Sequence, residues 1–369
     1  MDLGQTVAKR NAIMTRGRQT RKRATRTILA KDFDWLLFLM GGHIFFQTLS
    51  AAVQLDLFTL LSRRPRLTRA QIAQSLGLQE KPTRILLLGC TTLGLLKKVG
   101  ERYTNSPIAE KLLSRTKPEN ILSVVEWQHY INYRPMYRFY DALKANHNVG
   151  LEEYVGEGTT LYERLAKRPD LEKIFQAAME VISRQANQIL AKFIDLSRVR
   201  HLLDVGGGNA ANIIALAKKY PRLHATVFDS SSVCRIAEGN IQAVNLGDRL
   251  STISGNCFMD EFPRGFDCIL FAHFFTIWSE EKDRVLLKKS YRVLPHGGRV
   301  IIFNMMQSDR EDGPLNAAWG SPYFLTLATG EGMLYTWKEY EAWMKDAGFT
   351  TVRRQVLPVS HGAIIGIKR

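Results

Sequence analysis

The residues with the clearest chemical meaning form a glycine-rich segment and an acid at the end of the next predicted strand. The segment 201–205 supplies Leu, Leu and Val in the pattern of a strand buried on both faces. Gly206–Gly208 follow, and glycine permits a sharp turn and close approach of a ligand. Residues 212–219 predict a helix whose N-terminal amides face that ligand. The next strand ends at Asp229, where a carboxylate can accept hydrogen bonds from ribose hydroxyls. This order predicts a nucleotide-type cofactor site.

Two cofactor classes fit this outline. A dinucleotide site favours Gly-x-Gly-x-x-Gly with the third glycine inside the helix, whereas here the glycines are consecutive and the helix begins near Asn212. Asp204 also lies where a methionine ammonium would sit rather than a pyrophosphate. The segment therefore resembles the first motif of class I S-adenosylmethionine-dependent methyltransferases. That resemblance implies that Gly206 and Gly208 hold the methionine part and Asp229 the ribose.

Length and composition favour a globular protein of two domains. A chain of 369 residues with 45% hydrophobic content can bury a large core. No apolar run reaches the length of a membrane span. The four cysteines are scattered without paired spacing, which argues against a metal centre or disulfides and favours a reducing compartment. We therefore expect a cytoplasmic protein without a membrane partner.

The formal net charge of +16 is unevenly placed along the chain. Residues 1–31 hold nine Lys or Arg against one acid, Asp2, and show no apolar periodicity. We interpret this segment as a basic, disordered, solvated tail. A transit peptide, or a true start at Met14, remains open. A nucleic-acid arm is disfavoured because no aromatic residues are interleaved with the charges.

Residues 32–118 predict three helical regions followed by a wing. Apolar helices are expected over 32–61, and Thr68 and Gly77 are placed to cap and end a short helix. A third helix is expected from about 81 to 96 and a two-stranded wing over 97–104. Winged helices often bind DNA, but the third helix is rich in leucine rather than in polar side chains that reach base edges. A dimerisation module is therefore preferred, with a homodimer and no nucleic-acid partner.

The remainder divides into a helical linker and substrate-pocket region, 119–198, and a doubly wound α/β domain, 199–369. Strands are expected at 201–205, 224–228, 250–253, 267–271, 299–304 and 351–368, the last split by a turn. The linker region is rich in aromatic residues: Trp127, Tyr130, Tyr133, Tyr137, Phe139 and Tyr140. These residues form either inter-domain core or the walls of a small-molecule pocket.

Further segments carry a wider resemblance, which extends over residues 35–369. They are Asp204-Val-Gly-Gly-Gly208, Phe228-Asp229, Gly255-Asn-Cys-Phe258, Phe266-Asp267, Trp278-Ser-Glu-Glu281, Leu294-Pro-His-Gly-Gly-Arg299 and Ala347-Gly-Phe349. Together they resemble the small-molecule O-methyltransferase family, which includes caffeate, hydroxyindole and polyketide-tailoring enzymes.

The resemblance implies a fold, a cofactor and several site residues. It implies a Rossmann-like methyltransferase domain preceded by a mostly helical winged-helix dimerisation domain, with S-adenosylmethionine as cofactor. Asn256, Cys257 and Phe258 would lie at the adenine edge, and Trp278 against the methionine end. The family usually carries aspartate at the position of Asn256, and asparagine can still form hydrogen bonds there.

The resemblance fails where the family places its catalytic base. The family's His-Asp-Trp segment corresponds to Thr276, Ile277 and Trp278, and its supporting acids fall near Ser321 and Leu334. Three explanations remain open: transfer to a ring carbon, O- or N-methylation with a relocated base or an acidified substrate, and a non-methylating reaction. We prefer the first, because a ring carbon ortho to a phenol can attack the sulfonium carbon directly once it is placed in line. The helix containing residues 41–47 is also similar to bacterial C-methyltransferases that modify tyrosine-like amino acids in natural-product biosynthesis.

Three histidines are candidates for a relocated base: His43, His129 and His273. An imidazole needs little pKa shift to act near pH 7, but each of the three also has a purely structural interpretation. The residues expected to contact a small phenolic substrate are Tyr130, Tyr133, Arg134, Thr276, Asn316 and Ser321, with Glu126 as a further candidate. Arg134 would pair with a substrate carboxylate, while Asn316 and Ser321 would meet a ring hydroxyl.

Overall fold

The computed structural model describes residues 32–369, so the prediction for the basic tail lies outside the described residues. The chain divides into two compact units, one ending at Val125 and the other running from Glu126 to Arg369. The boundary lies beyond the predicted one at residue 118. The physical reason is that Leu122 and Val125 are buried in the hydrophobic core of the first unit.

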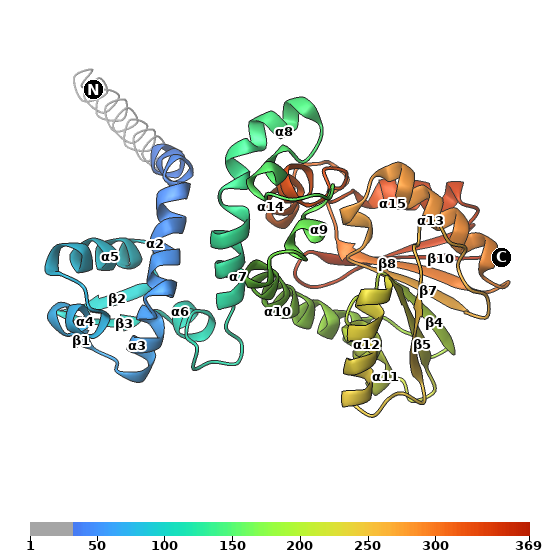
Figure 1. The fold of residues 1–369 in the computed structure, drawn as a ribbon, viewed down its shortest axis with the longest axis horizontal. Helices are drawn as coiled ribbons and strands as arrows, with labels where there is room; N and C mark the ends of the chain where they lie inside the picture. Colours follow the sequence, from blue (N-terminus) through green and yellow to red (C-terminus); the bar gives the residue numbers. More distant parts are fainter. Residues whose placement is uncertain (1–31) are drawn as a thin grey trace, which may run out of the picture. The chain divides into compact units, whose positions relative to one another are not determined.

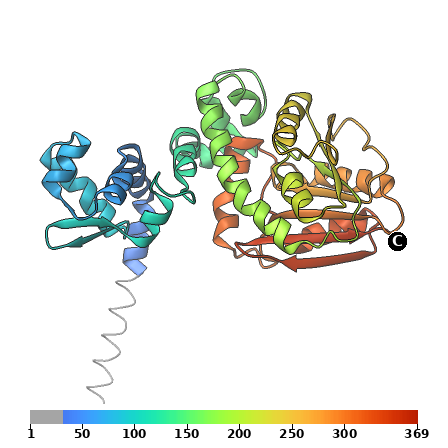
Figure 2. The same ribbon diagram turned by 90° about the horizontal axis from the view of Figure 1, so that it is seen from below.

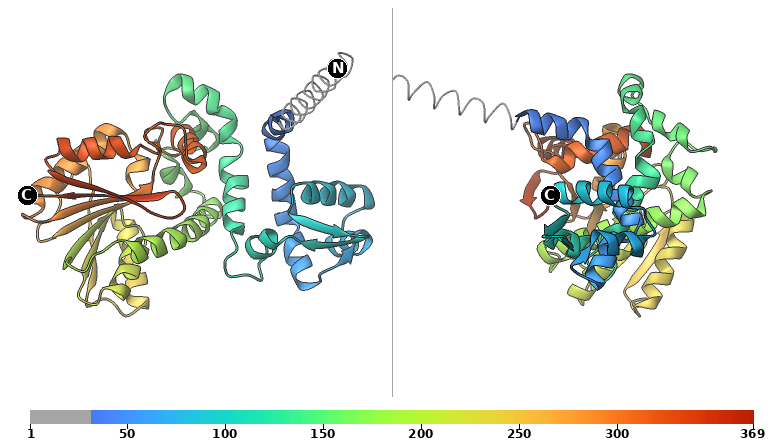
Figure 3. Two further views of the ribbon diagram at one scale, coloured as in Figure 1. Left: turned by 180° about the vertical axis from the view of Figure 1, so that it is seen from behind. Right: turned by 90° about the vertical axis from the view of Figure 1, so that its left-hand side faces the viewer.

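The first unit is a mostly helical domain with a small sheet. After a helix over Asp32–Met40 it contains α2 (Gly42–Gln54), α3 (Leu57–Arg63), β1 (Leu67–Thr68), α4 (Arg69–Leu76), α5 (Glu80–Thr92), β2 (Leu96–Val99), β3 (Arg102–Asn105) and α6 (Pro107–Leu112). The three strands form an antiparallel sheet in the order β1-β3-β2, seen from two sides in Figure 3. The predicted order of helices and wing is confirmed.

Local signals in this unit act largely as the sequence predicts. Thr68 and Gln71 form a capping box at the start of α4, and Gly77 ends the helix in the left-handed conformation. The third helix, α5, is shorter than expected and ends at Thr92. Gly94 has a left-handed backbone, with φ of +70°, and Leu96 already belongs to strand β2. The apolar run therefore continues through a turn into the wing.

The first unit exposes a large apolar surface. On α5, Leu86 and Leu87 are buried, but Ile85 is 61% and Leu88 67% exposed, so the leucine-rich helix is only partly committed to internal packing. The helix over Asp32–Met40 exposes Phe33, Trp35, Leu36, Leu37, Phe38, Leu39 and Met40. Surface of this kind marks an association site. Within residues 32–369 no single helix is long and apolar enough to span a membrane. Only Asp32–Met40 and α2 taken together reach that length and composition, and they are bent by 63°.

The second unit begins with irregular helices. Helix α7 (Leu122–Trp127) begins in the first unit and ends in the second. It leads into a π-helical turn, η1 (Gln128–Asn132), and then into η2 (Pro135–Arg138), α8 (Phe139–Ala145), η3 (Val149–Glu153), α9 (Leu161–Leu165) and the long α10 (Pro169–Phe193). Helix α10 packs along α11 (Ala211–Lys219), as Figure 2 shows. The expected helical character of the linker region is confirmed.

A seven-stranded sheet forms the rest of this unit (Figure 1). Its strands are β4 (His201–Val205), β5 (His224–Asp229), β6 (Leu250–Ser254), β7 (Cys268–Ala272), β8 (Arg299–Met305), β9 (Thr351–Val356) and β10 (His361–Ile367). They lie in the order β6-β5-β4-β7-β8-β10-β9, with β10 antiparallel to both of its neighbours. The chain runs outward from β4 to β6 and returns to β7 on the other side of β4. Parallel sheets of this kind bind ligands where the strand order reverses.

Helices cover both faces of the sheet. Helices α11 and α12 (Ser231–Ala243) pack on one face around Leu202, Val227 and Ile301. Helices α13 (Glu280–Val293) and α15 (Trp337–Asp346) pack on the other around Leu203 and Ile302. This arrangement confirms the doubly wound α/β fold with an antiparallel ending.

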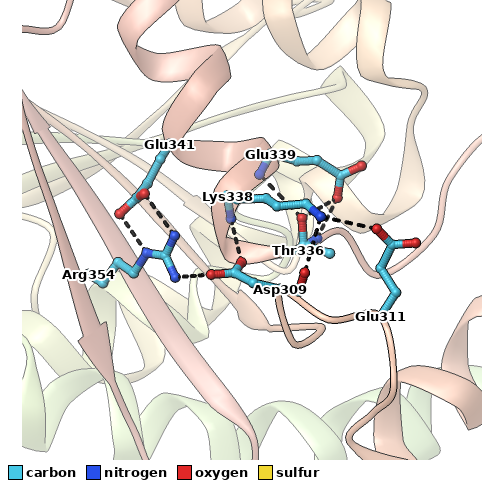
Figure 4. A network of polar contacts seen from close by, with 7 residues as sticks. All are labelled: Asp309, Glu311, Thr336, Lys338, Glu339, Glu341 and Arg354. Atoms are coloured by element: carbon cyan, nitrogen blue, oxygen red, sulfur yellow. Dashed lines mark hydrogen bonds and ion pairs between the residues drawn. The ribbon is translucent and has the colours of Figure 1, made fainter.

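A polar network fixes the loop that follows β8, as Figure 4 shows. Arg354 on β9 forms two hydrogen bonds with Glu341 on α15, at 2.6 and 2.8 Å, and an ion pair with Asp309 in the loop. Asp309 also accepts the backbone N–H of Lys338 at 2.8 Å. Burial opposes ionisation of Asp309, but Arg354 and Lys338 keep its pKa low. The network anchors the segment leading into α14 (Leu315–Tyr323), the helix that carries Asn316 and Ser321.

Candidate active site

The glycine loop lies at the switch point, directly after β4. Gly206 and Gly208 have φ of +69° and +59°, values that favour glycine. A Cβ at Gly206 would overlap the ring of Phe274, and one at Gly207 would lie 2.7 Å from Oδ2 of Asp204. The loop therefore packs so closely on its surroundings that side chains at these positions would displace either the loop or the residues beneath it.

Asp204 is fully buried beneath this loop. Neither of its carboxylate oxygens has a hydrogen-bond partner among residues 32–369. The pKa of Asp204 is raised to about 7, mainly by burial and in smaller part by the nearby Asp229, while Asn212 opposes the shift. A buried carboxylate without a partner requires an explanation, and a cationic ligand group is one. This fits the predicted role beside a methionine ammonium.

Asp229 holds the loop in place from the end of β5. Its carboxylate accepts the N–H of Gly208 at 3.1 Å and the N–H of Ser230 at 2.7 Å. Burial raises the pKa of Asp229 above its ordinary value, although these two backbone donors oppose the shift. Each carboxylate oxygen has lone pairs beyond those used here, so the group can still accept ribose hydroxyls.

The loop after β6 is closed by its own hydrogen bonds. Oδ1 of Asn256 accepts the N–H groups of Phe258 at 2.9 Å and Met259 at 3.3 Å, and the N–H of Asn256 donates to Asp260 at 2.7 Å. An asparagine thus caps the loop as an aspartate would, and its side-chain NH₂ remains able to donate. Burial raises the pKa of Cys257 to about 12, so its thiol is neutral and is a structural rather than a nucleophilic group.

Lys289 holds the loop after β6 in place, and the sequence analysis did not predict this role. Only 5% of Lys289 is exposed, and its Nζ donates to the carbonyl oxygens of Cys257 at 3.0 Å, Phe258 at 2.8 Å and Asp260 at 2.8 Å. The one available signal is its position between Leu286 and Ser290 on the inward face of α13, where a lysine is unusual.

An aromatic pair stands beside the loop. The rings of Phe258 and Trp278 meet edge to face at 4.8 Å, and Nζ of Lys282 lies 5.3 and 4.8 Å from their centroids. Lys282 also pairs with Glu331 at 2.7 Å. Nε1 of Trp278 is buried without a hydrogen-bond partner in the described chain. Together with the glycine loop and the two acids, these residues fit a cofactor that carries a ribose, an aromatic base and a charged tail.

Neutral groups occupy the positions of the family's base and acids. Thr276 is buried in the short 3₁₀ turn η4 (Phe275–Ile277), and a Cβ at Gly332 would overlap its carbonyl oxygen. Ser321 and Leu334 lie together, because Oγ of Ser321 accepts the N–H of Leu334 at 3.2 Å. None of these three side chains can take up a proton near neutral pH.

The three candidate histidines have different surroundings. His273 follows β7 with a left-handed backbone, and its ring meets those of Phe303 at 5.3 Å and His361 at 5.1 Å. Burial lowers the pKa of His273 to about 3, and His361 adds to the effect, so the ring stays neutral and weakly basic. His129 lies on η1 and meets Tyr130 edge to face at 4.6 Å. His43 is exposed on α2 of the first unit.

Apart from Thr276 on η4, the predicted substrate-contacting residues come from two segments that the fold brings together. Tyr130 lies on η1 and Tyr133 and Arg134 follow it directly, with Tyr130 and Arg134 exposed and Tyr133 half-buried. Asn316 and Ser321 lie on α14 and are half-buried. The link between the segments is Trp127, whose ring meets Trp319 at 6.3 Å and Tyr323 at 5.3 Å.

Comparison with known proteins identifies the chain. Residues 138–350 match the model of an O-methyltransferase domain, and residues 37–115 match an O-methyltransferase dimerisation domain. The chain is 40% identical over 341 residues to L-tyrosine C(3)-methyltransferase of Streptomyces lavendulae, covering 91% of this chain and 93% of that protein. It is 32% identical to 3-hydroxy-5-methyl-1-naphthoate 3-O-methyltransferase of Streptomyces sahachiroi, over 87% of this chain and 91% of that one.

Solved structures of methyltransferases share the fold of this chain. The S-adenosylmethionine-dependent methyltransferase SibL, in its apo form, superposes with a TM-score of 0.80 at 37% identity, covering 90% of this chain and 98% of that one. Human N-acetylserotonin methyltransferase in complex with S-adenosylmethionine shares the fold, with a TM-score of 0.78 at 24% identity, covering 91% and 97% of the two chains.

The fold and the glycine-loop site therefore define a class I methyltransferase that uses S-adenosylmethionine as its cofactor. The chain belongs to the O-methyltransferase family and carries that family's dimerisation domain. This confirms the predicted fold class, cofactor and enzyme class.

Proposed function

We propose that this enzyme methylates a ring carbon of a small phenolic substrate, a tyrosine-like amino acid in natural-product biosynthesis. The observation that carries the proposal is the neutral side chain of Thr276 where the family's resemblance predicts a catalytic histidine. An oxygen acceptor needs its proton removed, and a positioned base accelerates this by about two to four powers of ten. The similarity to a tyrosine C(3)-methyltransferase supports the same acceptor.

The cofactor supplies a methyl group on a positively charged sulfur. The phenol first loses its proton to water, and the ring carbon ortho to the oxygen then takes the methyl group in line. One carbon–carbon bond forms as the sulfur–carbon bond breaks, which leaves S-adenosylhomocysteine and a cyclohexadienone. Loss of the proton from the methylated ring carbon, to water or to a side chain, restores the aromatic ring as a phenolate, which then takes up a proton from water. Placement of the ring is the main contribution of the protein.

His273 and His129 remain the candidates in the second unit for a group that receives the ring proton. His273 is adjacent in sequence to Phe274, which contacts the glycine loop, so it belongs to the right edge of the sheet. Its lowered pKa makes it a weak base. A dienone is a strongly acidic carbon acid because proton loss restores aromaticity, so a weak base is sufficient for this step.

We further propose that the enzyme works as a homodimer in the cytoplasm. The exposed apolar helix Asp32–Met40, within a unit that carries the family's dimerisation domain, supports self-association. All four cysteines are free thiols, which supports a reducing compartment. Light scattering on the full chain tests the first point, and a mass of one subunit at micromolar concentration would contradict it.

The acceptor atom is tested with methyl-labelled cofactor and carbon NMR. The candidate substrates are L-tyrosine, L-phenylalanine and O-methyl-L-tyrosine. Comparing them shows whether the enzyme requires only an aromatic ring or a free phenol group. We expect an aryl-methyl signal with L-tyrosine and none with the other two. A methoxy signal with L-tyrosine would establish oxygen as the acceptor, which the similarity to a naphthoate O-methyltransferase makes the leading alternative.

A further inference from the structure

A row of aromatic rings connects the glycine loop with the loop after β6. A Cβ at Gly206 would overlap the ring of Phe274, and the centroid of that ring lies 6.2 Å from the centroid of Trp278. Trp278 in turn meets Phe258 edge to face at 4.8 Å. The indole Nε1–H of Trp278 is buried and has no acceptor among residues 32–369. A buried donor without an acceptor requires an explanation, and an acceptor atom of the cofactor is one.

The ammonium group of Lys282 lies over two members of this row. Its Nζ is 4.8 Å from the ring centroid of Trp278 and 5.3 Å from that of Phe258. A cation within about 6 Å of a ring centroid is attracted to the negative face of the ring, most strongly for tryptophan. The backbone of Lys282 is held as well, because its N–H donates to Oγ of Ser279 at the start of α13. Lys282 therefore restrains the two rings relative to one another.

Glu331 fixes the position of this ammonium group, at 2.7 Å from Nζ of Lys282. Glu331 lies in the short segment between η5 (Phe324–Ala328) and Leu334.

This segment is bound to the turn η4. Oγ1 of Thr329 donates to the carbonyl of Ile277 and accepts the N–H of Glu331 at 3.3 Å. A Cβ at Gly332 would overlap the carbonyl oxygen of Thr276, so the segment packs on η4 without space between them. The carboxylate that holds Lys282 is therefore itself anchored to the backbone of the acceptor half.

We propose that Lys282 and Glu331 are positioning residues for the cofactor: Lys282 holds the indole of Trp278 where it contacts the cofactor, and Glu331 holds Lys282 over the rings. An aromatic wall that is already fixed loses less conformational freedom when a ligand binds. The inference goes beyond the proposed function, because it does not depend on the acceptor atom. It rests on the assignment of Trp278 and Phe258 to the cofactor site.

The size of the expected effect follows from the exposure of the pair. The side chains of Lys282 and Glu331 are 40% and 35% exposed, so water and salt screen their interaction in part. A partly exposed ion pair and a partly exposed cation–π contact are each weak, and changes in Kd should be severalfold rather than hundredfold. The same exposure means that substitution of either residue leaves the core of the domain intact.

The test is calorimetric titration of the full-length enzyme with S-adenosylhomocysteine, without any acceptor. Lys282→Met removes both contacts and should raise the Kd about fivefold. Lys282→Arg keeps the charge and should stay within about twofold of wild type. Glu331→Gln removes only the ion pair and should raise the Kd about two- to threefold.

A charge-swapped variant separates the two contacts. Lys282→Glu combined with Glu331→Lys restores the ion pair but places a carboxylate over the rings of Trp278 and Phe258. Because the negative face of a ring repels a carboxylate, the Kd should remain at least as high as in Lys282→Met. A pair that serves only to anchor the segment would instead regain the wild-type Kd.

Arg284 provides a matched control on the same helix. Its guanidinium lies 5.6 Å from the ring centroid of Trp343 and pairs with Glu280 at 2.7 Å and with Asp346. It therefore makes the same two kinds of contact, but Trp343 is 1% exposed and packs in the core on α15. Arg284→Met should lower the melting temperature and leave the Kd of S-adenosylhomocysteine unchanged.

The position of the indole is read directly by fluorine NMR on the cofactor-free enzyme labelled with 5-fluorotryptophan. Trp278→Phe assigns the Trp278 signal by its disappearance. Lys282→Met should shift or broaden this signal, because the charge over the ring is lost and the ring is less restrained. The same signal should be unaffected in Arg284→Met.

Four results would each overturn the inference. They are a Kd within about twofold of wild type in Lys282→Met, a loss in Lys282→Arg equal to that in Lys282→Met, a wild-type Kd in the charge-swapped variant, and an unchanged Trp278 signal in Lys282→Met. The outcome is separable from that of the proposed function, because no acceptor is present. A raised Kd alongside a methoxy product keeps this inference and removes the carbon acceptor, and an aryl-methyl product with an unchanged Kd does the reverse.

Discussion

The two proposed halves of the active site are built in different ways. We assign the cofactor half to the loops that follow β4, β5 and β6, where some hydrogen bonds join residues near in sequence, such as those of Asn256 with Phe258 and Met259. The acceptor half combines η1, η4 and α14, which are far apart in sequence and irregular in form. Apart from Asn256, where the family usually has aspartate, the first half keeps the family's residue types, whereas the second has neutral residues where the family has ionisable ones. A shared cofactor constrains local sequence, while the choice of acceptor is made by distant irregular segments.

The largest effect should come from breaking the cofactor half at Asp229. Replacement by alanine removes the acceptor for Gly208 N–H and the predicted acceptor for ribose, and hydrogen bonds to charged groups contribute about 1.5–3 kcal/mol each. We expect the Kd of S-adenosylhomocysteine, measured by calorimetry, to rise about 100-fold or more. Asp248→Ala, an exposed acid on the same domain, is the control. An affinity within threefold of wild type would show that Asp229 does not bind the ribose.

Lys289 offers a second way to weaken the cofactor half without touching the acceptor half. Lys289→Met leaves three carbonyl oxygens of the loop without their donor, so the loop loses its fixed shape. The KM for S-adenosylmethionine should rise about tenfold while the KM for the acceptor stays constant. Lys289→Arg should restore part of the loss. Lys368→Met removes a comparable lysine, bonded to the carbonyls of Tyr291 and Leu294, and should leave both KM values unchanged.

Replacement of Asp204 should change the stability of the protein and its affinity for the cofactor in opposite directions. Its pKa is about 7 in the folded protein against an ordinary value of 3.8, so between these values the folded state holds a proton that the unfolded chain releases. Its contribution to stability is therefore present at low pH and lost as the pH rises through 7. Asp204→Asn should raise the melting temperature of the cofactor-free enzyme at pH 8 by about 2 °C or more, by less at pH 5, and hardly at all below pH 3.8, where the carboxyl group is neutral in both states.

The same substitution should weaken cofactor binding, because a neutral amide can accept a hydrogen bond from an ammonium but cannot form an ion pair with it. Calorimetry at pH 8 measures the loss of affinity for the cofactor, which is then compared with the gain in melting temperature. A variant that is less stable than wild type at pH 8, or one that binds the cofactor equally well, would contradict the role assigned to the buried carboxylate.

The smallest effect is expected at Thr276 in the acceptor half. Thr276→Val keeps the shape of the side chain and removes its hydroxyl, and kcat/KM should remain within about twofold of wild type, with an unchanged pH profile. A loss of a hundredfold would mean that the hydroxyl takes part in proton transfer, and it would remove the main argument for carbon as the acceptor.

Much of this architecture follows from local sequence. The alternation of apolar strands with helices predicts all seven strands within a residue or so of their observed bounds, because buried parallel strands and amphipathic helices have distinct periodicities. Capping residues act locally as well, as at Thr68 and Gly77. The glycine loop and Asp229 stand out in the sequence because each directly follows a buried strand, although the hydrogen bond between Gly208 and Asp229 joins residues 21 apart.

Tertiary structure determines which side chains are buried, and so which of them change their hydrogen-bond partners or their pKa. Only its place on the inward face of α13 distinguishes Lys289, which bonds to the loop after β6, from the solvent-exposed lysine beside it. No local pattern shows that Nε1 of Trp127 and Oδ1 of Asn132 lack a hydrogen-bond partner among residues 32–369, or that burial lowers the pKa of His273 to about 3. Sequence by itself determined the order of elements, the cofactor and the missing base, because each of these is encoded over short distances. Only the packed fold determined which polar atoms lose contact with water, because that depends on segments nearly two hundred residues apart, such as Trp127 and Tyr323.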